Sequence, residues 1–223
     1  MLRRYPVKAM GGESVDIAQV DERGLVGDRW FAVVDGEGRF ATGKDSRRFR
    51  RHDQIFDYRA LTTVTGGVVV KHADGAWPAG DPHLDAHLSE RFGEPVRVLP
   101  EQEIPHYDAA AVAIVGSASL DWLTEQTDRP ADVRRIRPNI VLATDEPFVE
   151  ESWVDRELKV GSVRLRVTER IERCRMIDID QDGALADTPW LTLLGREREV
   201  CLGVYADVVL PGLLRSGADA TLL

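Results

Sequence analysis

The residue best suited to chemistry in this chain is Cys174, which stands between Arg173 and Arg175. Two neighbouring guanidinium groups favour the thiolate over the thiol. A thiolate is a soft metal ligand and a nucleophile, so Cys174 is a candidate for metal ligation or covalent catalysis. The alternative is a small buried hydrophobe at the end of a strand. For Cys201, which has only apolar neighbours, that alternative is favoured.

A second polar cluster is the run Arg-Arg-Ile-Arg-Pro-Asn at 134–139. In an extended segment, Arg137 and Asn139 project from the same face. A guanidinium and an amide on one face suit a phosphate or the edge of a heterocycle. A solvated strand edge is the alternative. Ser117-Ala118-Ser119 opens a predicted helix, whose free N–H groups favour an anion.

A third cluster is basic and contains Arg39, Lys44, Arg47, Arg48, Arg50 and Arg51. Nucleic-acid binding is one interpretation, but the chain has a net charge of −9 and Phe49 is the aromatic residue within this run. A charged, solvated loop is the other interpretation. We expect no nucleic-acid partner, because an acidic protein repels phosphate backbones.

The bulk composition is that of a globular protein with 223 residues, of which 43% are hydrophobic and 30% charged. No apolar run approaches the length of a membrane span, and we expect no membrane partner. No secretory signal precedes the two cysteines. We therefore expect free thiols and a cytoplasmic location.

Several familiar catalytic motifs do not occur. The sequence contains no Gly-x-x-x-x-Gly-Lys phosphate loop, no dinucleotide fingerprint and no Gly-x-Ser-x-Gly elbow. Two cysteines cannot build a four-cysteine iron–sulfur cluster. If the protein carries out redox chemistry, its electrons must come from outside the chain.

Short strands are predicted to position these residues. The segment 162–168 alternates apolar and polar side chains, which is typical of a half-buried strand. A hairpin is expected around Gly66-Gly67, with further strands at 29–34, 95–99, 139–142 and 199–210, the last bulged at Gly203. Helices are expected at 83–92, 119–126 and 189–195, with Ser117 or Ser119 as an N-cap. The predicted class is mainly β, with two barrel-like modules and a few short covering helices.

A polar, then alanine-rich stretch at 100–111 suggests a boundary between two modules. We place an N-terminal module at 1–100 and a second domain at 101–223. No internal repeat or low-complexity tract is found.

These pieces, in this order, resemble a known family. The front motifs resemble the N-terminal β-barrel module that accompanies MOSC domains; they are Tyr5-Pro6-Val7-Lys8, Gly24-Leu25, Asp28-Arg29-Trp30-Phe31 and Thr42-Gly43-Lys44. The later motifs resemble the MOSC domain itself; they are Ser119-Leu120, Arg137-Pro138-Asn139-Ile140-Val141, Phe148, Glu151-Ser152-Trp153, Arg173-Cys174 and Gly203-Val204-Tyr205. The resemblance covers nearly the whole chain, and its specificity lies in the combination.

The family includes the mitochondrial amidoxime-reducing component and bacterial relatives that bind molybdenum cofactor. The resemblance implies that Cys174 ligates molybdenum beside the pterin dithiolene. It further implies that a set of polar side chains holds the pterin and its phosphate or lines the same cleft, namely Lys8, Arg29, Thr42, Lys44, Ser119, Arg137, Asn139 and Arg173. Pyridoxal phosphate is not expected, because no Schiff-base lysine with a phosphate cup can be identified.

The sequence also departs from the family pattern. Ala9 stands where relatives often carry serine, and Glu172 precedes Arg173 where better-known members carry a small residue or proline. A carboxylate beside an anionic cofactor repels it unless Arg170 or Arg175 neutralises the charge.

Two functions follow from the resemblance. The first is a molybdenum-dependent reductase of N-oxygenated compounds such as hydroxylamines, amidoximes and N-hydroxylated bases. Its electrons would come from an external flavin, iron–sulfur or haem protein. The second is a carrier of molybdenum cofactor or sulfur without turnover of its own. A non-metal anion binder is a third hypothesis, which requires that no metal or pterin is retained.

Overall fold

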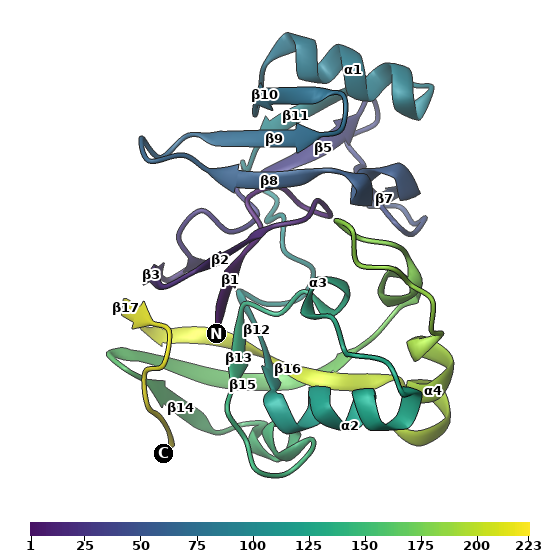
Figure 1. Ribbon diagram of the computed structural model, residues 1–223. Helices are drawn as coiled ribbons and strands as arrows, with labels where there is room; N and C mark the ends of the chain where they lie inside the picture. Colours follow the sequence, from purple (N-terminus) through teal and green to yellow (C-terminus); the bar gives the residue numbers. More distant parts are fainter.

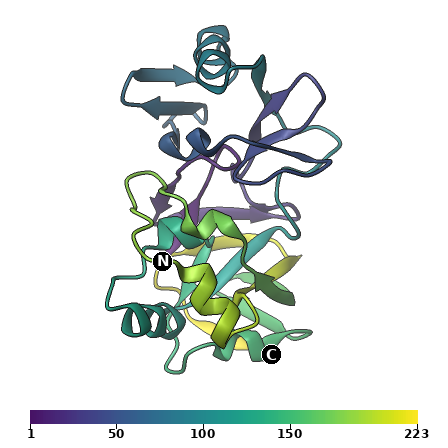
Figure 2. The ribbon, with the colours of Figure 1, turned by 90° about the vertical axis from the view of Figure 1, so that its right-hand side faces the viewer.

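The computed structural model describes residues 1–223. Figures 1 and 2 show two lobes stacked along one axis, with the chain's N-terminus where they meet. The upper lobe contains mostly residues before 100, and the lower lobe contains most of the rest. The two lobes have separate apolar cores, so each positions its own share of the functional residues.

The lower lobe is built on an eight-stranded sheet with the order β18-β14-β15-β16-β12-β13-β1-β2. In this sheet β12 and β13 are parallel, and the other neighbours are antiparallel. The strands are β1 Leu2–Arg4, β2 Glu13–Val15, β12 Val112–Gly116, β13 Ile140–Leu142, β14 Glu157–Val160, β15 Val163–Glu172, β16 Cys201–Leu210 and β18 Ala220–Leu222.

The upper lobe contains two smaller sheets, of order β10-β9-β8 and β11-β5-β6-β7. The strands are β5 Phe31–Asp35, β6 Phe40–Thr42, β7 Phe49–Arg51, β8 Arg59–Thr62, β9 Val68–His72, β10 Gly75–Pro78 and β11 Val96–Pro100. Helix α1 Pro82–Phe92 packs on this lobe, with Asp81 as its N-cap and Gly93 in the left-handed conformation at its end. A 3₁₀ helix, η1, spans Asp53–Asp57.

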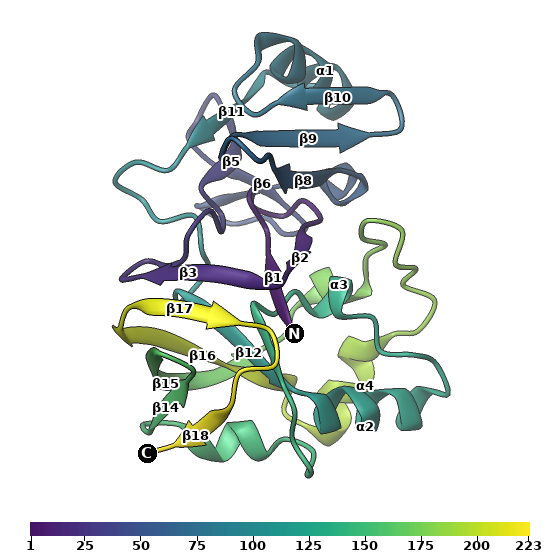
Figure 3. The ribbon, with the colours of Figure 1, turned by 60° about the vertical axis from the view of Figure 1, so that its left-hand side comes forward.

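The first strands tie the N-terminus to the lower lobe. Strand β3 Ile17–Asp21 pairs with β17 Gly212–Arg215 on one side and β4 Gly24–Leu25 on the other. Figure 3 shows β3 running beside β17. Because β1 also pairs with β13, the strands before residue 26 join the lower lobe. The division at residue 100 stays a prediction. Of the strands before residue 26, β1 and β3 pair with strands that follow residue 100.

The remaining helices belong to the lower lobe. They are α2 Ser117–Thr127, α3 Val133–Ile136, α4 Trp190–Glu197 and the 3₁₀ helices η2 Val149–Trp153 and η3 Arg175–Asp178. Eight buried residues from α2, α4 and neighbouring segments form a third apolar cluster, which includes Trp190 and Leu194. No helix is long and apolar enough to cross a bilayer.

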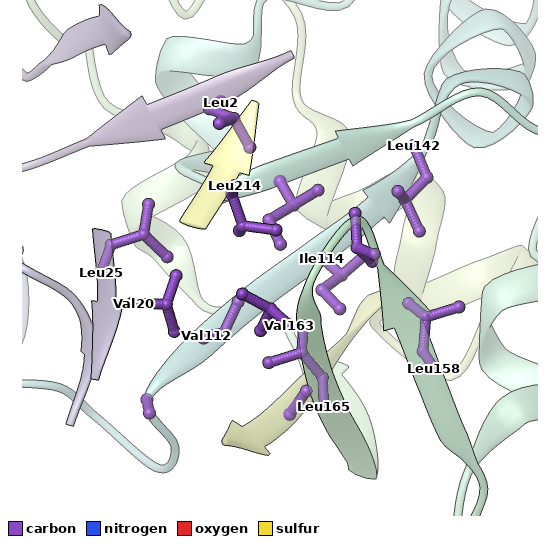
Figure 4. Close-up of a cluster of buried hydrophobic side chains, with 14 of the residues drawn as sticks. Leu2, Val20, Leu25, Val112, Ile114, Leu142, Leu158, Val163, Leu165 and Leu214 are labelled. Carbon is purple, nitrogen blue, oxygen red and sulfur yellow. The ribbon is translucent and has the colours of Figure 1, made fainter. Parts of the chain in front are cut away.

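The lower-lobe core shows why the alternating segment is a strand. Val163, Leu165 and Val167 are fully buried, whereas Arg166 between them is exposed. Figure 4 shows this core, in which side chains of β15 meet those of the N-terminal strands, Leu2 and Leu25 among them. Burial of one such side chain contributes about 1.5–3 kcal/mol.

The predicted class is confirmed, because strands dominate and the helices are few and short. The strands form open sheets rather than closed barrels. The hairpin at Gly66-Gly67 joins β8 to β9, as predicted. The bulge at Gly203 is also confirmed: the register shifts there, and the residue has φ +80°. The expected serine cap is wrong, because α2 begins after Gly116 with no side-chain cap.

Candidate functional site

A cavity of about 440 Å³ lies where the two lobes meet. That volume is within the usual range for small-molecule sites. Seven of the predicted site residues line it: Lys8, Arg29, Thr42, Lys44, Arg137, Arg173 and Cys174. The fold therefore brings together, around one cavity, side chains that are far apart in the sequence.

Cys174 lies at the end of β15, where the chain turns into η3. Its thiol is free, and the residue is half-buried on the cavity wall. Cys201 is also free but is only 5% exposed, does not line the cavity, and has its thiol pKa raised by burial. Of the two thiols, Cys174 is therefore the one that a ligand in the cavity can reach.

The two arginines that flank Cys174 are used differently. Arg173 donates only to backbone carbonyls, those of Leu202 at 2.9 and 2.5 Å and Ile136 at 2.8 Å. Burial lowers the pKa of Arg173, and no carboxylate lies within 4 Å of it. Arg175 instead makes an ion pair with Asp53 at 2.7 Å, which ties η3 to the upper lobe. Arg173 thus keeps an uncompensated positive charge beside the thiol.

Arg137 is a second cation without an acidic partner. Its guanidinium donates to the Met10 carbonyl at 2.7 Å and to Gln181 Oε1 at 3.4 Å. It lies over the Tyr5 ring, 4.4 Å from the centroid. Burial lowers its pKa to about 10. Removing a cation from water without a counter-charge is unfavourable, so this wall of the cavity favours an anionic ligand.

The segment 134–139 is not extended, so the condition for placing Arg137 and Asn139 on one face is not met. Val133–Ile136 form the short helix α3, capped by Asp132, and Arg137 follows in the left-handed conformation with φ 60°. Arg137 and Asn139 therefore do not lie on one face of a strand. Asn139 is buried outside the cavity, where its Oδ1 accepts from the Ala113 N–H at 3.0 Å and lies 3.5 Å from Arg29 Nη1.

Three residues of the cavity wall have backbone strain in common. Ala9, Arg29 and Arg137 have φ values of 65°, 53° and 60°. A non-glycine residue in this region costs about 1–3 kcal/mol, and such residues cluster at functional sites. Arg29 is further held by an ion pair with Asp28 and by its carbonyl, which lies 3.0 Å from His106 Nδ1.

The upper-lobe side of the cavity carries two lysines. Lys8 is 5% exposed and donates to the His106 carbonyl and to Asp108 Oδ1, both at 2.6 Å. Burial lowers the Lys8 pKa to about 8, and the attraction of Asp108 only partly opposes this. Lys44 Nζ lies 3.9 Å from the other Asp108 oxygen. Thr42 Oγ1 accepts from the Lys44 N–H at 3.3 Å and holds the turn between them.

Ser119 does not reach the cavity. Its side chain is fully buried, donates to Glu150 Oε1 at 2.7 Å and accepts from the Phe148 N–H at 2.7 Å. The hydroxyl therefore fastens η2 to α2. Ser119 and Asn139 are the two predicted site residues that the structure leaves off the cavity wall.

Thirteen of the 20 residues that line the cavity were not predicted as site residues, and Asp108, Tyr205 and Glu172 are among them. Asp108 lies between the lysines, and the pKa of its carboxyl, which burial raises, is held at about 2 by Lys8 and Lys44. Tyr205 on β16 has its pKa raised by burial, and Glu172 lies beside Arg173. In the sequence, Tyr205 belongs to the motif Gly203-Val204-Tyr205, and Asp108 is an acidic residue of the 100–111 linker. Neither observation fixes the position of the side chain in space.

Glu172 lacks the expected neutralising partner. Arg170 pairs with Glu151 and Glu199, and Arg175 pairs with Asp53. No cation lies within 4 Å of the Glu172 carboxylate. The cavity thus combines a reachable thiol and unpaired guanidinium groups with two carboxylates, those of Glu169 and Glu172, that have no cation within 4 Å.

Comparison with known families matches residues 1–76 to the MOSC N-terminal beta barrel domain and residues 84–221 to the MOSC domain. The chain is 25% identical to mitochondrial amidoxime-reducing component 1 of Homo sapiens, over 80% of this chain and 65% of that protein. It is 35% identical to molybdenum cofactor sulfurase of Danio rerio, over 55% of this chain and 18% of that protein. The chain thus spans somewhat less than two thirds of its amidoxime-reducing relatives.

A solved structure supports the fold. The YUAD protein of Bacillus subtilis superposes with a TM-score of 0.53 over 98% of this chain and 90% of that one, at 12% identity. At that identity the likeness concerns the fold and not the chemistry. Since the MOSC match alone covers more than half of the chain, the protein belongs to the MOSC domain family, with a MOSC N-terminal β-barrel domain ahead of it.

Proposed function

We propose that this protein binds molybdenum cofactor between its two lobes and reduces N-oxygenated compounds. The observation that carries the proposal is the half-buried Cys174 thiol on the wall of a cavity that also holds Arg137 and Arg173. Both guanidinium groups donate only to neutral oxygens. The thiolate is a soft ligand for a metal, and the unpaired cations can bind the phosphate of a metal-carrying cofactor.

The donor set fits that group. A thiolate is the side chain that softer transition metals select, and Cys174 is the thiol on this wall. Lys8 and Lys44 already bind one anion, the Asp108 carboxylate, at 2.6 and 3.9 Å. A phosphate can take the place of that carboxylate, because both present charged acceptor oxygens.

Each residue then has a defined task. Cys174 would hold the metal, and Arg173, which has no carboxylate partner within 4 Å, adds positive charge beside it. Arg137 and Arg29 hold the pterin side of the group, while Lys8 and Lys44 hold its phosphate, and the turn at Thr42 positions Lys44. When bound, the cofactor would supply two-electron redox and oxygen-transfer chemistry. The residues of the protein bind and orient the cofactor and give the site its positive charge.

The substrate class comes from the relatives. Proteins named amidoxime-reducing component match most of this chain, at 21–25% identity for those of Homo sapiens and Mus musculus. Hydroxylamines, amidoximes and N-hydroxylated bases share the N–O bond that such a reductase cleaves. Electrons come from an external flavin, iron–sulfur or haem protein, since two separate free cysteines cannot hold a cluster. A cytoplasmic location, and the absence of nucleic-acid and membrane partners, stay predictions.

The test is to purify the protein from molybdate-fed cells and to measure bound molybdenum and pterin. Turnover of benzamidoxime and hydroxylamine is then followed with an artificial reductant. We expect metal and pterin near one per chain, and turnover that Cys174→Ser abolishes. Cys201→Ser is the matched control, because it removes the thiol that lies off the cavity wall. Full activity in the Cys174→Ser protein would refute the assigned role.

A carrier of molybdenum cofactor or sulfur is the second candidate. The relative named molybdenum cofactor sulfurase, which is 35% identical over 154 residues, favours it. Cys174 would then hold sulfur or the metal in transit. Cofactor retention without turnover of either substrate, together with transfer of cofactor to an apo-enzyme, distinguishes the carrier from the reductase.

A further inference from the structure

Three metal-ligating side chains converge on the upper lobe, away from the cavity of the proposed function. His72 ends β9, Asp74 lies in the turn before β10, and His87 lies on α1. Their ligand atoms are all within 4.8 Å of one another. Asp74 Oδ2 lies 3.0 Å from His72 Nδ1 and 3.9 Å from His87 Nε2. In Figure 1 the β9–β10 hairpin runs beneath α1, which explains why these ligands meet.

The two imidazole rings are held in place by aromatic neighbours. Tyr58 stacks on His72 with centroids 4.5 Å apart, and Trp77 stacks on His87 at 4.6 Å. The Tyr58 hydroxyl lies 2.8 Å from His87 Nε2, and the Asp74 N–H donates to His72 Nδ1 at 3.3 Å; metal ligation replaces both contacts. Rings fixed by packing lose little freedom on binding an ion, and this raises the affinity of a site.

The surroundings carry a net negative charge and leave a path for the ion. A cavity of about 490 Å³ is lined by Gln54, Asp74, His87, Glu90 and Arg91. Arg91 lies 4.0 Å from Asp74 and 3.4 Å from Asp57, and with Glu90 three carboxylates outweigh its single positive charge. The Asp74 side chain is 55% exposed, and water can complete the coordination of a bound ion.

We propose that His72, Asp74 and His87 form a binding site for Zn²⁺. Two imidazole nitrogens and one carboxylate oxygen, with a water in the fourth position, are a ligand set that Zn²⁺ accepts. Mg²⁺ and Ca²⁺ prefer all-oxygen ligands and are disfavoured here. The bound ion links the β9–β10 hairpin to α1 and stabilises the upper lobe. It has no part in the proposed reaction.

The experiment uses the untagged full chain carrying Cys174→Ser, which removes the reachable thiol as a competing ligand. Metal-free protein is titrated with Zn²⁺ by calorimetry and with Co²⁺ by visible absorption. We expect one ion per chain, a tetrahedral Co²⁺ spectrum, and a higher unfolding temperature with Zn²⁺. Asp74→Asn and His87→Gln each weaken binding by at least about tenfold.

His83→Ala is the matched control, because His83 is exposed on α1 one turn before His87 and outside the cluster. We expect it to leave Zn²⁺ affinity unchanged. Loss of Zn²⁺ binding in His83→Ala, with binding retained in Asp74→Asn, assigns the ion to His83 and His87 on α1 and overturns the proposal. The absence of saturable Zn²⁺ binding also overturns it. Matching urea midpoints of the metal-free proteins show that each variant is folded. If Asp74→Asn does not fold, the Zn²⁺ affinity of His87→Gln tests the proposal instead.

Discussion

Lys8 and Asp108 are 100 positions apart, and their ammonium and carboxylate groups lie 2.6 Å apart at the cavity wall. Lys44 approaches the same carboxylate from the other side at 3.9 Å. The chain thus places an anion of its own between the two lysines proposed to hold a phosphate. This pair therefore links the stability of the linker at 100–111 to the occupancy of the site.

Replacing Asp108 with asparagine removes this internal anion. We expect inorganic phosphate to bind roughly tenfold more tightly to Asp108→Asn, because the lysines no longer have a competing charge. The free energy of unfolding falls by about 1 kcal/mol, since the carboxylate is one third exposed and the ion pair is partly screened. Calorimetry and urea unfolding measure the two effects. Asp219→Asn, an exposed change of the same charge, alters neither; unchanged phosphate affinity in Asp108→Asn contradicts the competition.

The ionisation of Lys8 makes anion binding depend on pH. Its pKa is lowered to about 8 by burial, so the free site loses positive charge as the pH rises through that value. Sulfate has a constant charge, and its affinity falls as the pH rises from about 7 to about 9. Lys8→Arg keeps its charge throughout and flattens the profile. A parent profile that is equally flat rules out Lys8 as a ligand for the anion.

Two arginines two positions apart show how similar residues come to serve different purposes. Arg135 is 2% exposed, donates to the carbonyls of Ile177 and Thr188 at 2.7 and 2.8 Å, and stacks on Trp190. It fastens the segment after η3 to the lower lobe. Arg137 lines the same cavity as Arg135, but it makes one short bond to a carbonyl and has no acidic partner.

Substitution of each arginine by methionine separates these purposes. We expect Arg135→Met to lower the free energy of unfolding by about 2–4 kcal/mol, because it leaves buried carbonyls without their donor and Asp178 without its ion-pair partner. Arg137→Met stays within about 1 kcal/mol of the parent but weakens sulfate binding by at least about tenfold. Urea unfolding and calorimetry on both variants check the contrast. Equal losses of stability would assign Arg137 to the framework.

The regular parts of the fold could be predicted from the sequence because their signals are local. Alternation at 162–168 and two adjacent glycines specify β15 and the hairpin without reference to distant residues. Helix α3 was missed because four residues are too few for helical periodicity, and only the Asp132 cap announces it. Its left-handed end then turns Arg137 into the cavity.

The composition of the site was predictable only in part. Cys174 and the cations are exceptional residue types in their surroundings, so they could be found. Ser119 could not be placed, because its hydroxyl is satisfied by Glu150, 31 residues away, and such a partner leaves no local pattern. Asp108 was missed for the same reason: only the folded chain brings the linker to Lys8.

His106 makes the protein sensitive to acid. The ring is 3% exposed, and burial lowers its pKa from 6.5 to about 4, so it is neutral in the folded protein. The unfolded chain binds a proton below pH 6.5 that the folded protein does not, and stability is lost as the pH falls from 6.5 towards 4. We expect a loss of about 2 kcal/mol between pH 7 and pH 5, measured by urea unfolding. An equal loss in His106→Gln shows that other groups are responsible.

Glu172 limits the affinity of the cavity for anions. Its carboxylate lines the wall beside Arg173 and has no cation within 4 Å, because Arg170 and Arg175 are paired elsewhere. Glu172→Gln removes one negative charge and keeps the shape of the side chain. We expect sulfate to bind about two- to tenfold more tightly, and the proposed cofactor to be retained in a larger fraction of purified molecules. Glu146→Gln changes the net charge equally at a distant exposed site. If both variants raise the affinity alike, the effect comes from net charge and not from the cavity.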